Sequence, residues 1–144
     1  MKPIILTTVL FLFLSDALGQ PPSKFNPNYK PKTLDEAIFQ LEKLHHDTTK
    51  VQILSMTEDQ FTIRSHFGMG MWIRNNWGLW GGGKLSKYFK SIGIFHPDDM
   101  SGIILTSYYR HLKRQDLELD KQVKYYLDYW KSSNKQQDSL KNLK

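Results

Sequence analysis

The stretch HPDDMSGIILTSYYRHLK, residues 96–113, decides the fold class. Pro97 suits the first position of a helix, and Asp98 and Asp99 bring acidic charge to the first turn, so we predict a helix over the rest of this stretch. The best candidate for a β-strand, Ile103–Thr106, falls inside that helix. No long alternating segment occurs elsewhere. We therefore predict an all-α fold, a small single-domain bundle of about five to six helices, some of them short.

Three helical segments are predicted ahead of this stretch. Residues 33–36, TLDE, have the pattern of a capping box, and apolar residues follow at helical spacing to about His46. Asp47 can cap a short turn that ends at Leu54. Residues 57–60, TEDQ, repeat the capping-box pattern before a segment that runs toward His66.

The middle of the chain, HFGMGMWIRNNWGLWGGGK at residues 66–84, combines tryptophan, arginine and asparagine unusually densely. Residues 67–76 are apolar nearly all round apart from Arg74, which predicts a buried helix. Glycines then interrupt it, and Lys84–Ile92 predicts another short helix. Near the C-terminus, residues 119–130 place apolar side chains on one face at helical spacing, namely Leu119, Val123, Tyr126 and Trp130.

The first nineteen residues have the composition of a secretory signal peptide. Lys2 precedes an apolar run, Ile4–Leu14, and the small residues Ala17 and Gly19 fit cleavage after Gly19. The run is short for a membrane span, which argues against the alternative of an uncleaved anchor. We therefore expect an exported protein, periplasmic or secreted, with no stable membrane span after cleavage.

Four parts follow from these patterns: a signal peptide at residues 1–19, a Pro/Lys-rich linker at 20–32, a helical domain at 33–130 and a basic polar tail at 131–144. The chain has no cysteine, so a packed core must stabilise it without disulfides. The net charge of +6 comes from the linker and the tail, because acidic and basic residues balance between residues 33 and 130. This distribution argues against binding of nucleic acid.

Several kinds of chemistry lack their residues. Residues 78–84 have the GxxxxGK spacing of a phosphate-binding loop, but Leu85 stands where a magnesium-binding hydroxyl belongs and no strand precedes it. The five histidines form no metal-binding pair at helical spacing, and neither a thiol nucleophile nor a GxSxG motif is present. We predict neither a metal site nor a cofactor.

Arg74 needs a partner, because an unpaired buried guanidinium is unfavourable. Asp98 and Asp99 are the candidates. Pairing with one of them would make the two helices neighbours and leave the other carboxylate free. His96 and the two aspartates could form a polar site, or they could simply cap their helix.

The predicted ligand-binding set contains residues of both segments: Arg74, Asn75, Asn76, Trp77, Trp80, His96, Asp98 and Asp99. Trp77 and Trp80 would stack on a ligand, Asn75 and Asn76 would bond it, and Asp99 would accept a hydrogen bond. An envelope glycan suits this chemistry, so a binding domain is the favoured function. A buried tryptophan-rich core is the competing explanation. The alternatives in function are a cell-wall hydrolase using Asp98 or Asp99, with Glu58 or Asp59 nearby, and an inhibitor-like protein-interaction module.

Two long blocks carry a family resemblance, HFGMGMWIRNNWGLWGGGKLSKYF at residues 66–89 and GIFHPDDMSGIILTSYYRHL at residues 93–112. They resemble an uncharacterised bacterial domain family of unknown function, and the resemblance runs from about Lys32 to Tyr129. It implies that both blocks belong to one domain. It brings no assigned activity and no catalytic residues.

Overall fold

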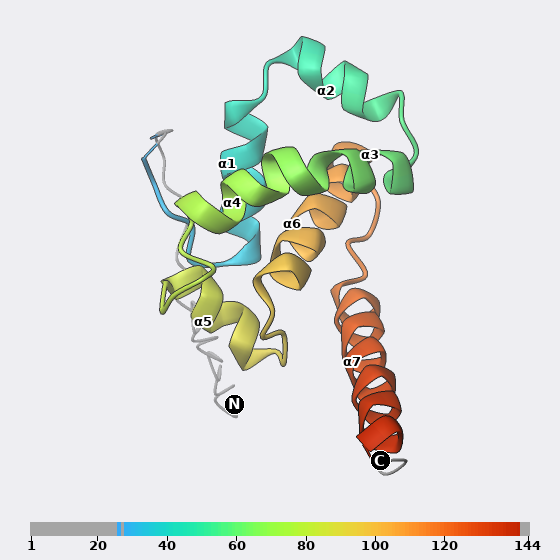
Figure 1. The fold of residues 1–144 in the computed structure, drawn as a ribbon. Helices are drawn as coiled ribbons and strands as arrows, with labels where there is room; N and C mark the ends of the chain where they lie inside the picture. The colour runs from blue at the N-terminus through green and yellow to red at the C-terminus, as the bar shows by residue number, and fades with distance from the viewer. Residues whose placement is uncertain (1–25, 27, 142–144) are drawn as a thin grey trace, which may run out of the picture.

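The computed structural model describes residue 26 and residues 28–141, with side chains as far as residue 134. All regular secondary structure in these residues is helical. The elements are α1 (Leu34–Leu44), α2 (Asp47–Leu54), α3 (Glu58–Ser65), a π-helical turn η1 (His66–Gly70), α4 (Met71–Asn76), α5 (Lys84–Ser91), α6 (Pro97–Leu112) and α7 (Leu119–Lys141). Because α3, η1 and α4 run on without a break as one rod, the described residues form six helical bodies (Figure 1). The predicted all-α bundle is confirmed.

Helix α6 is the hub of the bundle and contacts every other helix (Figure 1). Met100, Ile103, Ile104 and Tyr108 of this helix are wholly buried. A helix that is apolar nearly all round must be surrounded by other elements, which is the position α6 occupies. The Ile103–Thr106 segment that could have favoured a strand is therefore the centre of the helical core.

The two predicted capping boxes differ. At α1, the Thr33 hydroxyl accepts the Glu36 N–H at 3.3 Å, but the Glu36 carboxylate accepts the Tyr29 hydroxyl and the Lys32 N–H, both at 2.7 Å. Pro31 is buried beside them, so the end of the predicted linker packs against the domain. At α3, both halves of the box form, between Thr57 and Gln60.

The rod is less buried than the apolar run from Phe67 to Asn76 predicted. Phe67 is 76 % exposed and Trp72 is 38 % exposed, whereas Ile73 and Arg74 are buried. A π-helical turn inserts an extra residue into the helix, so a spacing of 3.6 residues per turn does not predict which residues beyond η1 are buried. The apolar run thus divides between core and surface.

Helix α7 packs antiparallel along α6 at three levels. The contacts pair Ser107 with Gln122, Gly102 with Tyr126 and Asp99 with Trp130. The helix continues to Lys141, further than the predicted end near Trp130, so the predicted polar tail begins as part of a helix.

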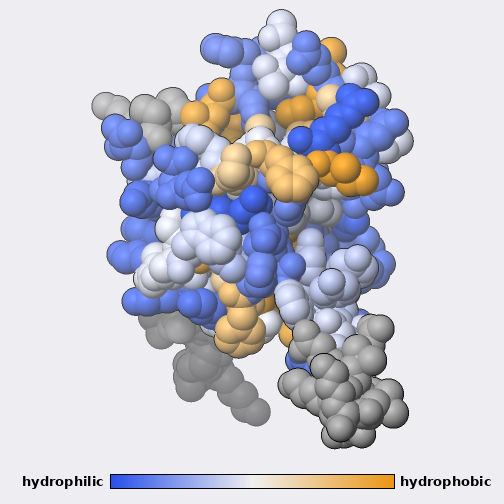
Figure 2. Space-filling model, viewed as in Figure 1, coloured by the Kyte–Doolittle hydropathy of each residue, from blue (hydrophilic) through white to orange (hydrophobic). Residues whose placement is uncertain are grey.

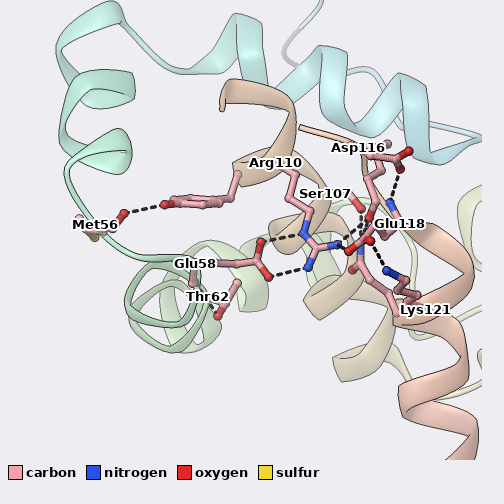
Figure 3. A network of polar contacts seen from close by, with 11 residues as sticks. Met56, Glu58, Thr62, Ser107, Arg110, Asp116, Glu118 and Lys121 are labelled. Carbon is pink, nitrogen blue, oxygen red and sulfur yellow. Dashed lines mark hydrogen bonds and ion pairs between the residues drawn. The ribbon is translucent and has the colours of Figure 1, made fainter. Parts of the chain in front are cut away.

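Arg110 fixes the start of α7 (Figure 3). Its guanidinium makes two hydrogen bonds with the Glu58 carboxylate, at 2.7 and 2.9 Å, and also reaches the Leu117 carbonyl and the Glu118 carboxylate. Bidentate arginine–carboxylate pairs hold both side chains in one geometry. Arg110 therefore joins the beginning of α3, the end of α6 and the turn into α7.

The predicted signal peptide lies outside the described residues, as does most of the predicted linker. Among the helices that the structure describes, none combines the length and the apolar character needed to cross a membrane.

Candidate functional site

An ion pair between a buried arginine and a partly exposed aspartate joins the two sequence blocks. Arg74 is 5 % exposed, and its Nη1 lies 3.1 Å from Asp98 Oδ1 and donates to Ser101 Oγ at 2.9 Å. This confirms that Arg74 pairs with one of the two aspartates, and it makes α4 and α6 neighbours, as that pairing predicted.

Gly70 makes room for this arginine. A Cβ at Gly70 would lie 3.2 Å from Arg74 Nη1 and 3.3 Å from the Ser65 carbonyl. The π-helical turn also turns the His66 carbonyl toward the site, where it accepts Arg74 Nη2 at 3.4 Å. Gly68 has no neighbour that would clash with a side chain, so close packing explains only one of the two glycines.

His96 caps α6. Its Nδ1 accepts the Asp98 N–H at 3.3 Å. Oδ2 of the Asp98 carboxylate lies 3.5 Å from the same nitrogen. The capping role considered for His96 in the sequence is confirmed.

Asp99 has a different environment from Asp98. Its Oδ2 accepts the indole N–H of Trp130 at 2.7 Å. Among the described residues, no lysine or arginine forms an ion pair with Asp99. Burial raises the pKa of the Asp99 carboxyl, although the bond from Trp130 and the nearby His96 act in the opposite direction. Asp99 is thus a half-buried carboxylate without a cationic partner there.

Asp99 faces a cavity of about 340 Å³ between the N-terminal end of α6 and the middle of α7, which we call the α6–α7 pocket. It is lined by Gly93, Ile94, Phe95, His96, Asp99, Tyr126, Leu127 and Trp130. The His96 and Trp130 rings lie 5.5 Å apart, centre to centre, and burial raises the pKa of Tyr126 to about 12. Its size is that of sites that bind small molecules.

A shallower groove adjoins it. Asp99 and Tyr126 also line this groove, of about 440 Å³, which extends toward the rod and includes His66 and Phe67. Asp99 therefore separates an aromatic pocket from a more polar groove.

The tryptophan-rich motif was predicted to form the ligand site, but its predicted site residues line neither of these two cavities. Trp77 is 3 % exposed and packs edge-on against Trp72, so the ligand-stacking role predicted for it is wrong. Trp80 is exposed, but its indole N–H is bonded to Asn75 Oδ1 at 3.0 Å. Asn76 donates to the Trp72 carbonyl at 2.8 Å. Asn75, Asn76, Trp77 and Trp80 line neither cavity beside Asp99.

Two of the carboxylates considered for glycoside hydrolysis are engaged in ion pairs. That reaction uses two carboxyl groups that face each other across the substrate. Asp98 is engaged with Arg74, and Glu58, one of the two proposed second carboxylates, is held by Arg110. In the described residues, no group of three or more histidine or acidic side chains is placed to hold a metal ion.

Trp130, Tyr126 and Phe95 are the aromatic pocket residues that sequence reasoning missed. Tyr126 and Trp130 are four residues apart, and this spacing was interpreted only as the core-facing side of a helix. Trp130 is in fact 40 % exposed and Phe95 is 68 % exposed. The signal that the sequence offered for Phe95 was its position, since this aromatic residue directly precedes His96 and the two aspartates.

The fold and the site define a small all-α domain with a ligand-sized pocket beside a half-buried carboxylate. Residues 30–112 match the family described as a domain of unknown function, DUF6794. The match covers more than half of the chain, so the chain belongs to this family, and the predicted membership of an uncharacterised domain family is confirmed. No curated protein and no solved structure matches the chain. The matched residues end with α6, so α7 lies beyond them.

Proposed function

We propose that this protein is an exported binding domain and that the α6–α7 pocket is its ligand site. One contrast supports this most directly: Asp98 is neutralised by Arg74, whereas the adjacent Asp99 has no cationic partner among the described residues. A half-buried charge without a partner is unfavourable for folding alone. A ligand that supplies the missing partner would offset the unfavourable burial of this charge.

Binding fits the site better than catalysis. The Asp98 carboxylate is held by Arg74, and the Asp99 carboxylate is held by the Trp130 indole at one oxygen. General acid–base catalysis needs a carboxyl group that is free to exchange a proton with the substrate, so these two contacts disfavour it. The pocket instead offers aromatic walls and one charge, which is a recognition surface.

Nuclear magnetic resonance of the indole N–H groups tests this site directly. The chain has four tryptophans, and a Trp130→Phe variant assigns the Trp130 signal. The protein is titrated with a library of small fragments that includes oligomers of N-acetylglucosamine, the glycan class predicted from the sequence. We expect some compounds to shift the Trp130 signal and leave that of the buried Trp77 unchanged. If no compound shifts the Trp130 signal, the pocket is not a ligand site.

Export has its own test. Expression of the full chain in a bacterial host and mass analysis of the secreted or periplasmic protein should give a mature chain that begins at Gln20. A protein retained in the cytoplasm with an intact N-terminus would rule this part of the proposal out.

A second candidate function, contact with another protein, is favoured by the surface of the rod. Ile63, Phe67 and Met71 are 72 %, 76 % and 48 % exposed and recur every four residues. Figure 2 shows apolar side chains gathered where α3 and α4 cross this face. Large exposed apolar side chains in a row are characteristic of interaction surfaces. A second copy of the chain is the partner to test first, by light scattering of the protein and of a Phe67→Ser variant across a concentration series.

A further inference from the structure

We propose that the α6–α7 pocket recognises an alkylated ammonium group, such as a trimethylammonium. This inference rests on the proposed function, because it names the ligand class of the same pocket. Three features of the pocket narrow the choice of ligand: the carboxylate of Asp99, the aromatic rings around it and the small number of hydrogen-bonding groups within reach.

The charge of the pocket favours a cation. Asp99 is the one acidic residue that lines it, and no lysine or arginine is part of the lining. His96 also lines the pocket, and its Nδ1 is already occupied as the acceptor of a backbone N–H. The neighbouring negative charge, on Asp98, is already balanced by Arg74. A bound cation would therefore meet one uncompensated carboxylate, and an anion would be repelled by it.

The walls of the pocket favour the same kind of ligand. Phe95, Tyr126 and Trp130 come from two different segments and line one cavity together with His96. Aromatic rings carry negative potential on their faces and attract cations, and cages of such rings with a nearby carboxylate are a general means of recognising quaternary ammonium groups. The Trp130 indole is oriented by its bond to Asp99, so the ring and the charge are held together.

The pocket offers few hydrogen-bonding groups, and this favours an alkylated ammonium over a primary ammonium as its ligand. A primary ammonium has three N–H donors that need acceptors, whereas a quaternary ammonium has none. Asp99 offers an acceptor, but one of its oxygens is already engaged by Trp130, and most of the remaining lining is apolar or aromatic. A primary amine would lose hydrogen bonds to water on entering, and a trimethylammonium would not. A free small molecule and a lipid headgroup can both present this group.

Three probe molecules test the proposal by calorimetric titration. Choline chloride carries the trimethylammonium, 3,3-dimethylbutan-1-ol is its neutral counterpart of the same shape, and ethanolamine is its primary amine. We expect choline to bind at least about tenfold more tightly than either of the other two, because contacts of a cation with several rings and one carboxylate differ by this order from neutral contacts. Binding of choline should also shift the Trp130 indole signal and weaken as salt increases.

Matched variants locate the charge. Asp99→Asn should weaken choline binding by about tenfold or more, whereas Asp128→Asn, which removes the same charge from an exposed position on α7, should leave it unchanged. Should Asp99→Asn fail to fold, Trp130→Leu removes an aromatic face while keeping an apolar side chain and should also weaken binding. Equal binding by Asp99→Asn and the unchanged protein would overturn the proposal.

The outcomes separate this inference from the proposed function. If the neutral alcohol binds as tightly as choline and shifts Trp130, the pocket is a ligand site but its selectivity for a cation is refuted. If no probe and no library compound shifts Trp130, both proposals fail. Vesicles of phosphatidylcholine, compared with vesicles of phosphatidylglycerol, identify the source: sedimentation of the protein with the first alone indicates a lipid headgroup, and binding of free choline alone indicates a small molecule.

Discussion

Replacing Gly102 by alanine tests the packing of α7 on α6. Glycine inside a helix is less favourable than alanine by about 1 kcal/mol, so the substitution on an isolated α6 would be stabilising. In the folded protein the new Cβ would overlap the Tyr126 hydroxyl, which lies far closer than two such atoms normally approach. Overpacking of this kind destabilises by about 1 to 3 kcal/mol. We therefore expect Gly102→Ala to have a net effect between neutral and about 2 kcal/mol destabilising.

Tyr126→Phe supplies the matched background. Without the hydroxyl, the nearest ring atom to the new Cβ is the Cζ of residue 126 at 3.5 Å, an ordinary contact. The Tyr126 hydroxyl makes no hydrogen bond among the described residues, so its removal should have little effect by itself. In the Tyr126→Phe background, Gly102→Ala should then stabilise the protein by about 1 kcal/mol.

The assay is urea unfolding followed by far-ultraviolet circular dichroism for all four proteins of this cycle. The two effects of Gly102→Ala should differ by at least about 1 kcal/mol between the backgrounds. If Gly102→Ala stabilises equally in both, α7 does not pack on α6 at this level, and the α6–α7 pocket lacks the wall that α7 provides.

Three further changes have defined outcomes. Asp98→Ala should destabilise by about 1 to 3 kcal/mol in urea unfolding because it leaves Arg74 buried without its partner, and an unchanged midpoint would show that the pair is not formed. Thr57→Ala should destabilise by about 1 kcal/mol, since it removes a complete capping box, whereas Thr48→Ala, at an exposed position of α2 with no cap bond, should have a smaller effect on the thermal midpoint. Asp99→Asn should be at least as stable as the unchanged protein at pH 7. Burial raises the pKa of Asp99 in the folded state, so the folded protein binds this proton more tightly than the unfolded chain does. The stability that protonated Asp99 contributes is therefore lost as pH rises through the folded-state pKa. The advantage of the Asp99→Asn variant should shrink as pH falls toward the ordinary range of aspartate, and a loss of stability on substitution at pH 7 would contradict this account.

Local signals in the sequence predicted local structure well. Pro97 with two following aspartates marks the start of α6, and the TEDQ pattern marks the capping box of α3, because these effects act within one turn. The pairing of Arg74 with an aspartate was also predictable, since a guanidinium within an apolar helix requires a partner.

The pocket could not be predicted, because it depends on the register between helices. Trp130 reaches Asp99 across 31 residues of chain only because α7 runs antiparallel to α6 at one particular offset. Likewise, the burial of Trp77 and the exposure of Phe67 depend on the extra residue in the π-helical turn. From the sequence, Phe67 was predicted to lie in a buried helix and Trp77 to stack on a ligand.

The central position of α6 has a consequence for how the chain is made. Residues 34–76 form helices whose main packing partner, residues 97–112, is synthesised after them. His45 bonds Tyr108 across 63 residues and Met56 bonds Tyr109 across 53, so these contacts wait until most of the chain has left the ribosome. A growing chain that stops short of α6 has helices but nothing to assemble them around. The packed core of the domain can therefore form only after residues 97–112 have been synthesised.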